Sequence, residues 1–334
     1  MTSVMPWHGT QFSEVLGRRD RLPHALLLHG RKGIGKLRFA LALAHALLCE
    51  HPTPEGSCGA CASCAWLQSG VHPDFRRLEP AVDSDSDDDT PRTKASTQIV
   101  IEQVRALSEF LFVSTHRGGW RPVIVHPAEA LNPNAANALL KSLEEPPAHT
   151  LFILVSHRLH QLLPTIKSRC QLLPLPAPRR DQAAAWLAEQ GVEDAELAAA
   201  HTGHAPLLAM ELQEQDYWAQ RKRFLGHLAA PQIDVLTAAE QCNEAGIPAL
   251  LEWLQKWTYD VASRQLTGTV RYNPDHEKTL SRVAAGCSPV RMLRFHRELV
   301  RMQRHAQHPL NVRLFLEQML FAYAEVASPR AATT

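Results

Sequence analysis

Short apolar runs alternate with longer helix-forming stretches in the first half of this chain. Three runs have the length and composition of buried β-strands, and they stand at residues 25–29, 122–125 and 151–155. The helix-forming stretches are rich in alanine and leucine or space their apolar residues at helical intervals, and they stand at residues 36–48, 98–112 and 134–143. Strands that alternate with helices are typical of an α/β domain with a largely parallel sheet.

The second half of the chain shows helical patterns only. A proline-rich segment from Leu173 to Pro178 separates it from the first half and predicts a domain boundary. Helical patterns at 181–190 and 194–201 indicate a small helical domain, and those from about 208 to 327 indicate a larger one. We therefore predict three domains, at residues 1–172, 173–207 and 208–334.

The composition fits a soluble globular protein. Of the 334 residues, 45% are hydrophobic and 21% are charged, which is enough for two or three separate cores. Residues 1–11 contain no basic region followed by an apolar run, and no stretch has the apolar length that a bilayer requires. We therefore expect a cytoplasmic protein without a membrane partner. The net charge of +1 disfavours a protein that holds DNA by its overall field.

An acidic run from Asp83 to Asp89 lies inside a polar stretch at about residues 80–97. Its charges repel one another and no apolar residue anchors it, so we predict a disordered loop. The composition is compatible with a mimic of nucleic-acid phosphates, but it favours a solvated insertion.

A phosphate-binding loop follows the first predicted strand. Gly30, Gly35 and Lys36 match the glycines and lysine of the G-x-x-x-x-G-K-[ST] motif, and Gly33 adds a third glycine. The order of strand, glycine-rich loop and helix makes the match credible. The next residue is Leu37, however, where the motif requires a hydroxyl group that holds Mg²⁺. The loop is therefore a degenerate nucleotide site.

Other groups that phosphoryl transfer needs are missing as well. In phosphate-loop ATPases an acid after a neighbouring strand holds Mg²⁺, but here His126 and Pro127 follow the 122–125 strand. We expect the nearest carboxylate, Glu129, on the wrong side of the turn. Because positioning and charge neutralisation supply nearly all of this catalysis, we predict no ATP hydrolysis. Bound ATP is not expected, although Lys36 and the loop amides could hold a phosphate weakly.

Four cysteines form a compact cluster, in which Cys58, Cys61 and Cys64 follow Cys49 with two residues between neighbours. Without an export signal such cysteines indicate metal ligands rather than disulfides. Four soft thiolates favour a closed tetrahedral site for structural Zn²⁺. An iron–sulfur cluster is one alternative, although ferredoxin-type runs place the fourth cysteine downstream, and buried reduced thiols are another. We predict a zinc module at residues 49–64.

Arg169 lies in the tripeptide Ser168-Arg169-Cys170, just before the predicted sheet domain ends. A lone arginine is usually a solvated surface charge. Where another subunit presents a nucleotide, however, an arginine inserted in trans stabilises charge on a transferred phosphoryl group. Upstream, residues 137–147 have the sequence Asn-Ala-Leu-Leu-Lys-Ser-Leu-Glu-Glu-Pro-Pro, an amphipathic helix ended by proline that indicates no chemistry by itself.

Together these motifs resemble those of one family. The phosphate loop, the cysteine cluster, the 137–147 sequence, Ser168-Arg169-Cys170 and the segment from His308 to Asn311 occur in the order found in δ′ subunits of the bacterial DNA polymerase III clamp loader. The 137–147 sequence followed by Ser-Arg-Cys is highly specific to clamp-loader subunits. The resemblance covers nearly the whole chain except the acidic loop. Two features, the degenerate phosphate loop and His126, distinguish the chain from the motor subunits γ and τ.

The resemblance implies a fold and a set of partners. The expected fold is an α/β AAA+ domain, similar to P-loop NTPases, with the inserted zinc module, followed by a small helical lid domain and an all-α collar domain. The implied partners are the clamp-loader γ/τ and δ subunits, with the sliding clamp and primed DNA reached through the complex. The chain would then be a component of a DNA-directed DNA polymerase holoenzyme.

The resemblance also implies a role. A δ′ subunit resembles a rigid stator that does not hydrolyse ATP and that extends its Ser-Arg-Cys arginine, here Arg169, into the ATP site of an adjacent motor subunit. The family's zinc module maps onto the four cysteines. No Arg or Lys stands between His201 and Met210, where active AAA+ subunits would carry a sensing arginine. We therefore predict no enzymatic activity of the chain itself and activation of a partner ATPase.

One helix of the expected collar has two opposed faces. Its apolar face carries Met292, Phe295, Leu299 and Met302, and its basic face carries Arg294, Arg297, Arg301 and Arg304. From residue 261 onward there are 11 Lys and Arg against 5 Asp and Glu, an excess of +6. The basic face could contact DNA or an acidic partner, but solvent is favoured because charge runs are usually solvated.

Two functions of other classes stay open. The first is an active AAA+ ATPase with unconventional Mg²⁺ ligands. The second is a stand-alone zinc-dependent nucleic-acid-binding protein, which the net charge of +1 disfavours.

Overall fold

The structure, a computed structural model, describes residues 3–81, 96–113, 115–116, 119–214, 216–303 and 311–327. The chain divides into two compact units, Met1–Pro178 and Arg179–Thr334. The acidic run at 83–89 and the segment from His308 to Leu310 lie outside the described residues.

A five-stranded sheet forms the centre of the first unit. Its strands are β1 (Ala25–His29), β2 (Arg76–Leu78), β3 (Arg121–Val125), β4 (Thr150–Ser156) and β5 (Gln171–Pro174). Their order across the sheet is β2-β3-β4-β1-β5, and every neighbouring pair is parallel. In the register of the central strands Leu27 lies opposite both Leu154 and Leu172. A fully parallel sheet needs a layer on each face, since its crossover connections run over both.

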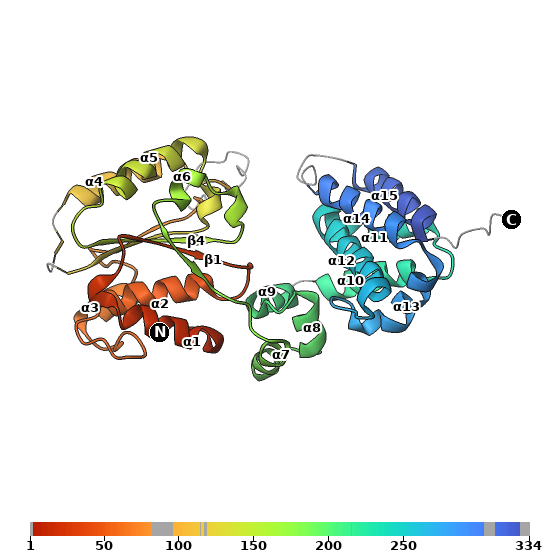
Figure 1. Ribbon diagram of the computed structural model, residues 1–334, viewed down its shortest axis with the longest axis horizontal. Coiled ribbons are helices and arrows are strands. Elements are labelled where there is room, and N and C mark those ends of the chain that lie inside the picture. The colour runs from red at the N-terminus through yellow and green to blue at the C-terminus, as the bar shows by residue number, and fades with distance from the viewer. Residues whose placement is uncertain are drawn as a thin grey trace, which may run out of the picture. The chain divides into compact units, whose positions relative to one another are not determined.

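Helices cover both faces of this sheet, with α1, α2 and α3 on one side and α4, α5 and α6 on the other (Figure 1). The first group is η1 (Pro6–His8), α1 (Gly9–Leu16), η2 (Arg19–Arg21), α2 (Lys36–Leu48) and α3 (Ala62–Gln68). The second group is α4 (Ile101–Phe112), η3 (Ala128–Ala130), α5 (Pro133–Glu144), η4 (Leu159–Gln161) and α6 (Pro164–Lys167).

The alternation of strand side chains explains the two layers. Leu27, Val125 and Leu154 are completely buried and pack in one cluster with residues of α4 and α5, such as Leu107 and Leu139. Their neighbours along the strands point to the opposite face, and they are buried as well. Each such side chain contributes roughly 1.5–3 kcal/mol relative to an exposed one. The continuous apolar runs of the sequence therefore correspond to strands buried on both sides.

The predicted α/β class is confirmed, and β1 and α2 have the predicted bounds. Strands β2 and β5 were not predicted, because both lie at sheet edges and carry exposed side chains. Strand β5 includes Leu172 and Leu173, between which the first domain boundary was expected. The proline-rich segment nevertheless marks the division, since the first unit ends at Pro178.

The second unit is helical throughout its described residues. It begins with three small helices, α7 (Arg180–Glu189), α8 (Ala195–His201) and α9 (Pro206–Glu211). These are followed by η5 (Leu212–Glu214), α10 (Tyr217–Ala229), α11 (Val235–Cys242), η6 (Asn243–Ala245), α12 (Gly246–Thr267), η7 (Pro274–His276), α13 (Glu277–Gly286), α14 (Pro289–Met302) and α15 (Val312–Ala327).

Two apolar clusters hold this unit together. A small cluster built on Leu187, Ala199 and Ala209 joins α7, α8 and α9. A larger one surrounds the long helix α12, whose Trp253 and Trp257 are buried. The indole N–H of Trp257 donates to the Tyr323 hydroxyl at 2.8 Å, so this buried side chain keeps a polar partner.

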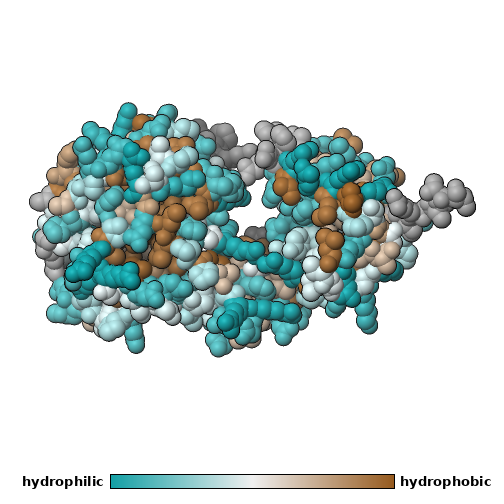
Figure 2. All heavy atoms as spheres, viewed as in Figure 1, coloured by the Kyte–Doolittle hydropathy of each residue, from teal (hydrophilic) through white to brown (hydrophobic). Residues whose placement is uncertain are grey.

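Helix α14 has the two faces that its sequence predicts. Met292, Phe295 and Leu299 are buried and Met302 is half-buried, whereas Arg294, Arg297 and Arg301 are exposed. Arg304 lies outside the described residues. Figure 2 shows a mostly hydrophilic surface on the visible face of each unit, with hydrophobic side chains gathered in small areas. Among the described helices, none combines the length and the apolar character needed to cross a bilayer.

Candidate functional site

The phosphate loop connects β1 to α2 and depends on glycine at three positions. Gly30, Gly33 and Gly35 have φ angles of 150°, 79° and 97°, which residues with side chains rarely adopt. At Gly35 a Cβ atom would lie 2.3 Å from Cγ of Met5. The glycines therefore serve both the turn and a close approach of the N-terminal segment.

Lys36 is buried beside the loop rather than extended into solvent. Its ammonium group donates to the carbonyl oxygen of Gly30 at 2.8 Å and to that of Arg31. Burial lowers the pKa of Lys36 to about 8, against the opposing effect of the Glu129 carboxylate. The side chain that would hold a phosphate is thus satisfied by backbone oxygens of its own loop.

The N-terminal residues cover this loop, which sequence reasoning did not anticipate. Met5 is buried against Gly35, and the indole N–H of Trp7 donates to the carbonyl oxygen of Ile34 at 3.0 Å. The buried His8 forms a hydrogen bond of 3.0 Å between its Nε2 and the carbonyl oxygen of Pro176. Residues 3–9 carry no recognisable motif, so only their packing in the structure shows that they cover the phosphate loop.

Two histidines stand at the carboxyl ends of β3 and β4, where an ATPase would hold Mg²⁺. The rings of His126 and His157 meet edge to face with centroids 5.3 Å apart. His126 Nδ1 lies 3.2 Å from Oε1 of Glu79, which follows β2 and also pairs with Arg77 at 2.8 Å. Glu79 was not predicted as part of the site, since no strand was predicted before it. A histidine therefore replaces the expected acid, and the nearby carboxylate is already paired.

Glu129 lies closer to the loop than its sequence position suggested. We expected it on the wrong side of the turn, yet its charge interacts with the Lys36 ammonium group. Its Oε1 accepts the backbone N–H of His157 at 2.9 Å, while its Oε2 is buried without a hydrogen-bond partner among the described residues. Burial, reinforced by the Lys36 charge, lowers the pKa of His157 to about 3, so that this imidazole stays neutral beside the loop.

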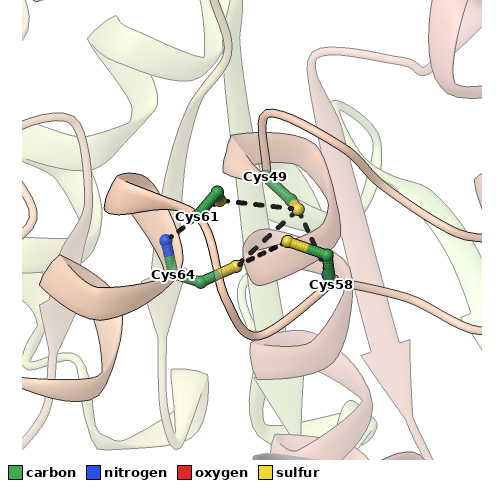
Figure 3. A group of neighbouring side chains, drawn as sticks. All are labelled: Cys49, Cys58, Cys61 and Cys64. Atoms are coloured by element: carbon green, nitrogen blue, oxygen red, sulfur yellow. Dashed lines mark hydrogen bonds between the residues drawn. The ribbon is translucent and has the colours of Figure 1, made fainter.

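The four cysteines of the cluster converge on one point (Figure 3). Cys49 follows α2, Cys61 is the N-cap of α3 and Cys64 lies in its first turn, while Cys58 comes from the intervening loop. Their sulfur atoms all lie within 4.8 Å of one another. The separations are 3.7 Å for Cys64 and Cys49, 3.9 Å for Cys49 and Cys61, and 4.0 Å for Cys58 and Cys64.

These separations fit a tetrahedral metal site. With Zn–S bonds of about 2.3 Å, the edges of a tetrahedron of sulfur atoms are about 3.8 Å long. A disulfide would bring two sulfur atoms to about 2.05 Å. Backbone N–H groups of Ala60 and Cys61 lower the pKa of Cys58 to about 6, whereas burial raises that of Cys64 to about 12. The donor set thus has the chemistry and spacing of a closed four-thiolate centre.

Ser63 fixes this cluster to the sheet domain. Its hydroxyl donates to the carbonyl oxygen of Leu48 at 2.7 Å and lies 2.9 Å from Nε2 of the buried His72. His72 in turn accepts the backbone N–H of Asp74 through Nδ1. The residue between two ligand cysteines is therefore tied to the end of α2.

Arg169 follows α6 and is one-third exposed. Its guanidinium group pairs with the carboxylate of Glu144, the last residue of α5, and donates to the carbonyl oxygen of Thr165 at 3.0 Å. The structure therefore brings together the two motifs that stood apart in the sequence, the 137–147 helix and Ser168-Arg169-Cys170. Cys170 is buried in the core between the sheet and helices α4, α5 and α6, and this burial raises the pKa of its thiol to about 11.

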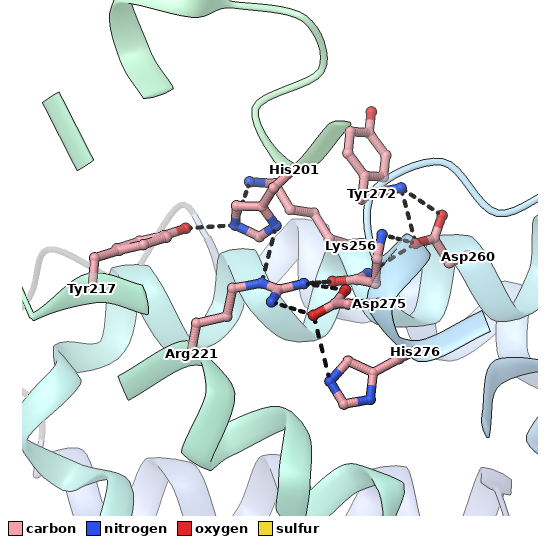
Figure 4. A network of polar contacts seen from close by, with 9 residues as sticks. His201, Tyr217, Arg221, Lys256, Asp260, Tyr272, Asp275 and His276 are labelled. Carbon is pink, nitrogen blue, oxygen red and sulfur yellow. Dashed lines mark hydrogen bonds and ion pairs between the residues drawn. The ribbon is translucent and has the colours of Figure 1, made fainter. Parts of the chain in front are cut away.

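The stretch from His201 to Met210, which contains no Arg or Lys, contributes His201 to a polar network (Figure 4). His201 is buried and lies 2.8 Å from the Tyr217 hydroxyl, and its Nδ1 accepts a hydrogen bond from Arg221 at 3.2 Å. Arg221 forms a bidentate pair with Asp275 and also donates to Asn273 at 2.8 Å. Helix α8 is thereby joined to α10 and to the segment after α12.

Comparison with protein families covers most of the chain. Residues 10–179 match the family described as DNA polymerase III, delta subunit, and residues 215–325 match DNA polymerase III, delta subunit, C terminal. The chain is similar to the DNA polymerase III subunit delta' of Pseudomonas aeruginosa, with 39% identity over 80% of each chain. The protein of the same name from Escherichia coli is 33% identical over 86% of this chain and 84% of the relative.

A solved structure of a DNA polymerase III gamma subunit-related protein from Thermotoga maritima aligns with 95% of this chain and 99% of its own, at 19% identity and a TM-score of 0.49. The predicted family is confirmed by the sequence matches, which extend over both units and include the phosphate loop, the cysteine cluster and Arg169. The chain therefore belongs to the family of DNA polymerase III δ′ subunits.

Proposed function

We propose that this chain is a non-hydrolysing stator subunit of a DNA polymerase III clamp loader in the cytoplasm. It would help to load the sliding clamp on primed DNA, together with γ/τ and δ subunits. Family membership supports the assembly. The observation that carries the non-hydrolysing role is the packing of Met5 against Gly35, beside Leu37 where a Mg²⁺ ligand would stand.

Arg169 is the residue that we assign to the ATP site of a neighbouring motor subunit. Its side chain is one-third exposed, and its partner Glu144 is about half exposed. Such a pair contributes only about 0–1 kcal/mol to stability, because solvent screens both charges. Phosphate oxygens of a partner's nucleotide would therefore compete readily for the guanidinium group, whose planar fork suits them.

The cysteine cluster is proposed to hold one structural Zn²⁺ through Cys49, Cys58, Cys61 and Cys64. A bound zinc ion would cross-link the loop between α2 and α3. Four protein ligands leave no open position for water, so no catalytic role is assigned to it. Within the second unit we assign α7–α9 to the lid and α10–α15 to the collar.

The test is reconstitution of the complex with γ/τ and δ subunits, followed by measurement of ATP hydrolysis with sliding clamp and primed DNA. Arg169→Ala should assemble normally but slow turnover at the one affected site by roughly 10³-fold or more, with a smaller effect on the whole complex. Lys167→Ala, on α6 two residues away, is the matched control and should behave like wild type. Equal ATPase and clamp-loading rates in both variants would refute the role of Arg169.

One observation favours the alternative of an active ATPase. Glu129 Oε2 is buried near Lys36 without a hydrogen-bond partner among the described residues, and it is the best candidate for an unconventional Mg²⁺ ligand. An ATPase assay of the isolated chain distinguishes between the two functions. We expect no Mg²⁺-dependent hydrolysis of ATP by it, and hydrolysis that disappears in Glu129→Gln would establish the alternative.

A further inference from the structure

A cavity of about 450 Å³ lies in the second unit, away from the phosphate loop and the cysteine cluster. It is open to solvent and is lined by the start of α7, the end of α8, the C-terminal half of α12 and the segment that follows α12. The polar side chains of its wall are those of Arg180, His204, Tyr259, Ser263, Thr267, Thr269 and Arg271.

The charge of this wall is of one sign. Arg180 and Arg271 supply two guanidinium groups, and the wall contains no carboxylate. A neighbouring cavity beside Arg221 differs, because Glu193, Asp194 and Asp275 contribute to its wall. The cavity at Arg271 is therefore suited to an anion, and the one at Arg221 is not.

Both guanidinium groups are available to a ligand. Among the described residues, that of Arg271 has no hydrogen-bond or ion-pair partner and lies 5.6 Å from the centroid of the Tyr272 ring. Arg180 pairs with Glu196 at 3.6 Å, but both side chains are more than half exposed, so this pair contributes little. A multiply charged anion would offer both arginines a stronger partner.

The backbone that carries Arg271 is held firmly at the cavity. The carboxylate of Asp260, which is completely buried, accepts backbone N–H groups of Arg271, Tyr272 and Asn273 at 2.8–3.1 Å. Figure 4 shows Asp260 directed at the backbone beside Tyr272. The Asp260 carboxylate thus accepts hydrogen bonds from backbone amides. The Arg271 side chain, in contrast, is exposed and belongs to the cavity wall.

Three hydroxyl groups complete the site. The Thr267 and Thr269 hydroxyls lie 2.8 Å apart, and that of Ser263 is 3.3 Å from each. Thr267 also donates to the carbonyl oxygen of Ser263 at 2.9 Å. The hydroxyl hydrogens of Ser263 and Thr269 can rotate toward a ligand, and hydroxyl groups beside arginines are suitable donors to phosphate oxygens.

We infer that this cavity binds a phosphate group through Arg180, Arg271 and the hydroxyls of Ser263 and Thr269. The phosphate belongs to a free nucleotide or pyrophosphate, or to the backbone of a single DNA strand. In the second case Tyr259, which lines the cavity and is 37% exposed, offers a ring on which a base can stack. The inference does not depend on the proposed function, because it requires no partner subunit.

The test measures binding to the full-length chain by two probes, sodium pyrophosphate in calorimetry and a fluorescent single-stranded oligothymidylate in anisotropy. We expect saturable binding of at least one probe, weakened about tenfold or more in Arg271→Ala because a charge-assisted bond is lost. Arg264→Ala is the matched control on α12, since Arg264 pairs with Glu277 and does not line the cavity. Binding at the phosphate loop would be equal in both variants and would not produce this difference.

Binding of pyrophosphate alone identifies a free phosphate as the ligand. Oligothymidylate that binds and competes with pyrophosphate identifies a DNA strand. The inference is overturned if neither probe saturates at millimolar concentration. It is equally overturned if Arg180→Ala and Arg271→Ala both bind as tightly as wild type while their thermal unfolding shows them to be folded.

Discussion

Glu144 and Arg169 form an ion pair that joins the end of α5 to the turn after α6. Both side chains are partly exposed, so we expect Glu144→Gln and Arg169→Ala each to change the free energy of unfolding by less than about 1 kcal/mol. Urea denaturation of the two variants checks this. A larger loss in Arg169→Ala would mean that its effect on a reconstituted complex reflects folding rather than chemistry.

The buried arginine of the second unit should behave differently. Arg221 is only 2% exposed and forms a bidentate pair with Asp275, so Asp275→Ala leaves a buried cation without its main partner. We expect a loss of about 3 kcal/mol in the free energy of unfolding. Glu277→Ala, which breaks the exposed pair with Arg264, is the control and should cost under about 1 kcal/mol. Equal losses in the two variants would contradict the importance of burial.

Because Met5 approaches Gly35 closely, we predict that the effect of substituting Gly35 depends on the side chain at position 5. Gly35→Ala places a Cβ 2.3 Å from Met5 Cγ at a φ of 97°, and we expect a loss of about 2–4 kcal/mol from strain and collision together. The double variant Met5→Ala/Gly35→Ala removes the collision but not the strain. The double variant should therefore lose less stability in thermal unfolding than the sum of the losses of the two single variants. Losses that simply add would argue against the contact.

The cysteine cluster predicts one tightly bound zinc ion per chain. Cys64→Ser should abolish metal binding and lower the melting temperature, because the loop between α2 and α3 then lacks its cross-link. Cys287→Ser, a cysteine of the second unit outside the cluster, should retain the metal. Elemental analysis of the purified chain provides the measurement. Iron in place of zinc would show that the alternative of an iron–sulfur cluster is correct.

Acidic pH should weaken the first unit through His157. Its pKa is about 3 in the folded chain and about 6.5 in the unfolded chain, so below pH 6.5 only the unfolded chain takes up the proton. Stability is therefore fully present above pH 6.5 and is lost progressively as the pH falls toward 3. The melting temperature should decrease between pH 7.5 and 5, and less so in His157→Gln. An identical decrease in this variant would assign the effect to other groups.

Strong local signals account for most of what the sequence predicted. The apolar run of 25–29, the glycines after it and the alanine-rich stretch of 36–48 each specify one element, and β1, the loop and α2 lie where they were expected. The two-residue spacing of Cys58, Cys61 and Cys64 likewise predicted a cluster, because such spacing brings thiols together whatever surrounds them.

Features that depend on contacts between distant segments were not predicted. Strand β2 has only three residues, two of them exposed arginines, so its pairing with β3 leaves no periodic pattern. The positions of Glu79 beside His126 and of Glu129 near Lys36 follow from the order of the strands, which composition does not determine. Met5 belongs to no sequence motif, so its contact with Gly35 can be recognised only in the folded chain.

Helix α2 has the buried Lys36 at its first residue and is followed directly by Cys49. Its 13 residues make a rod of about 20 Å between the phosphate loop and the cysteine cluster. Ser63 fastens the far end of this rod through the carbonyl oxygen of Leu48. If the four sulfur atoms hold a metal ion, its loss would therefore free the C-terminal end of the same helix whose first residue, Lys36, belongs to the phosphate loop.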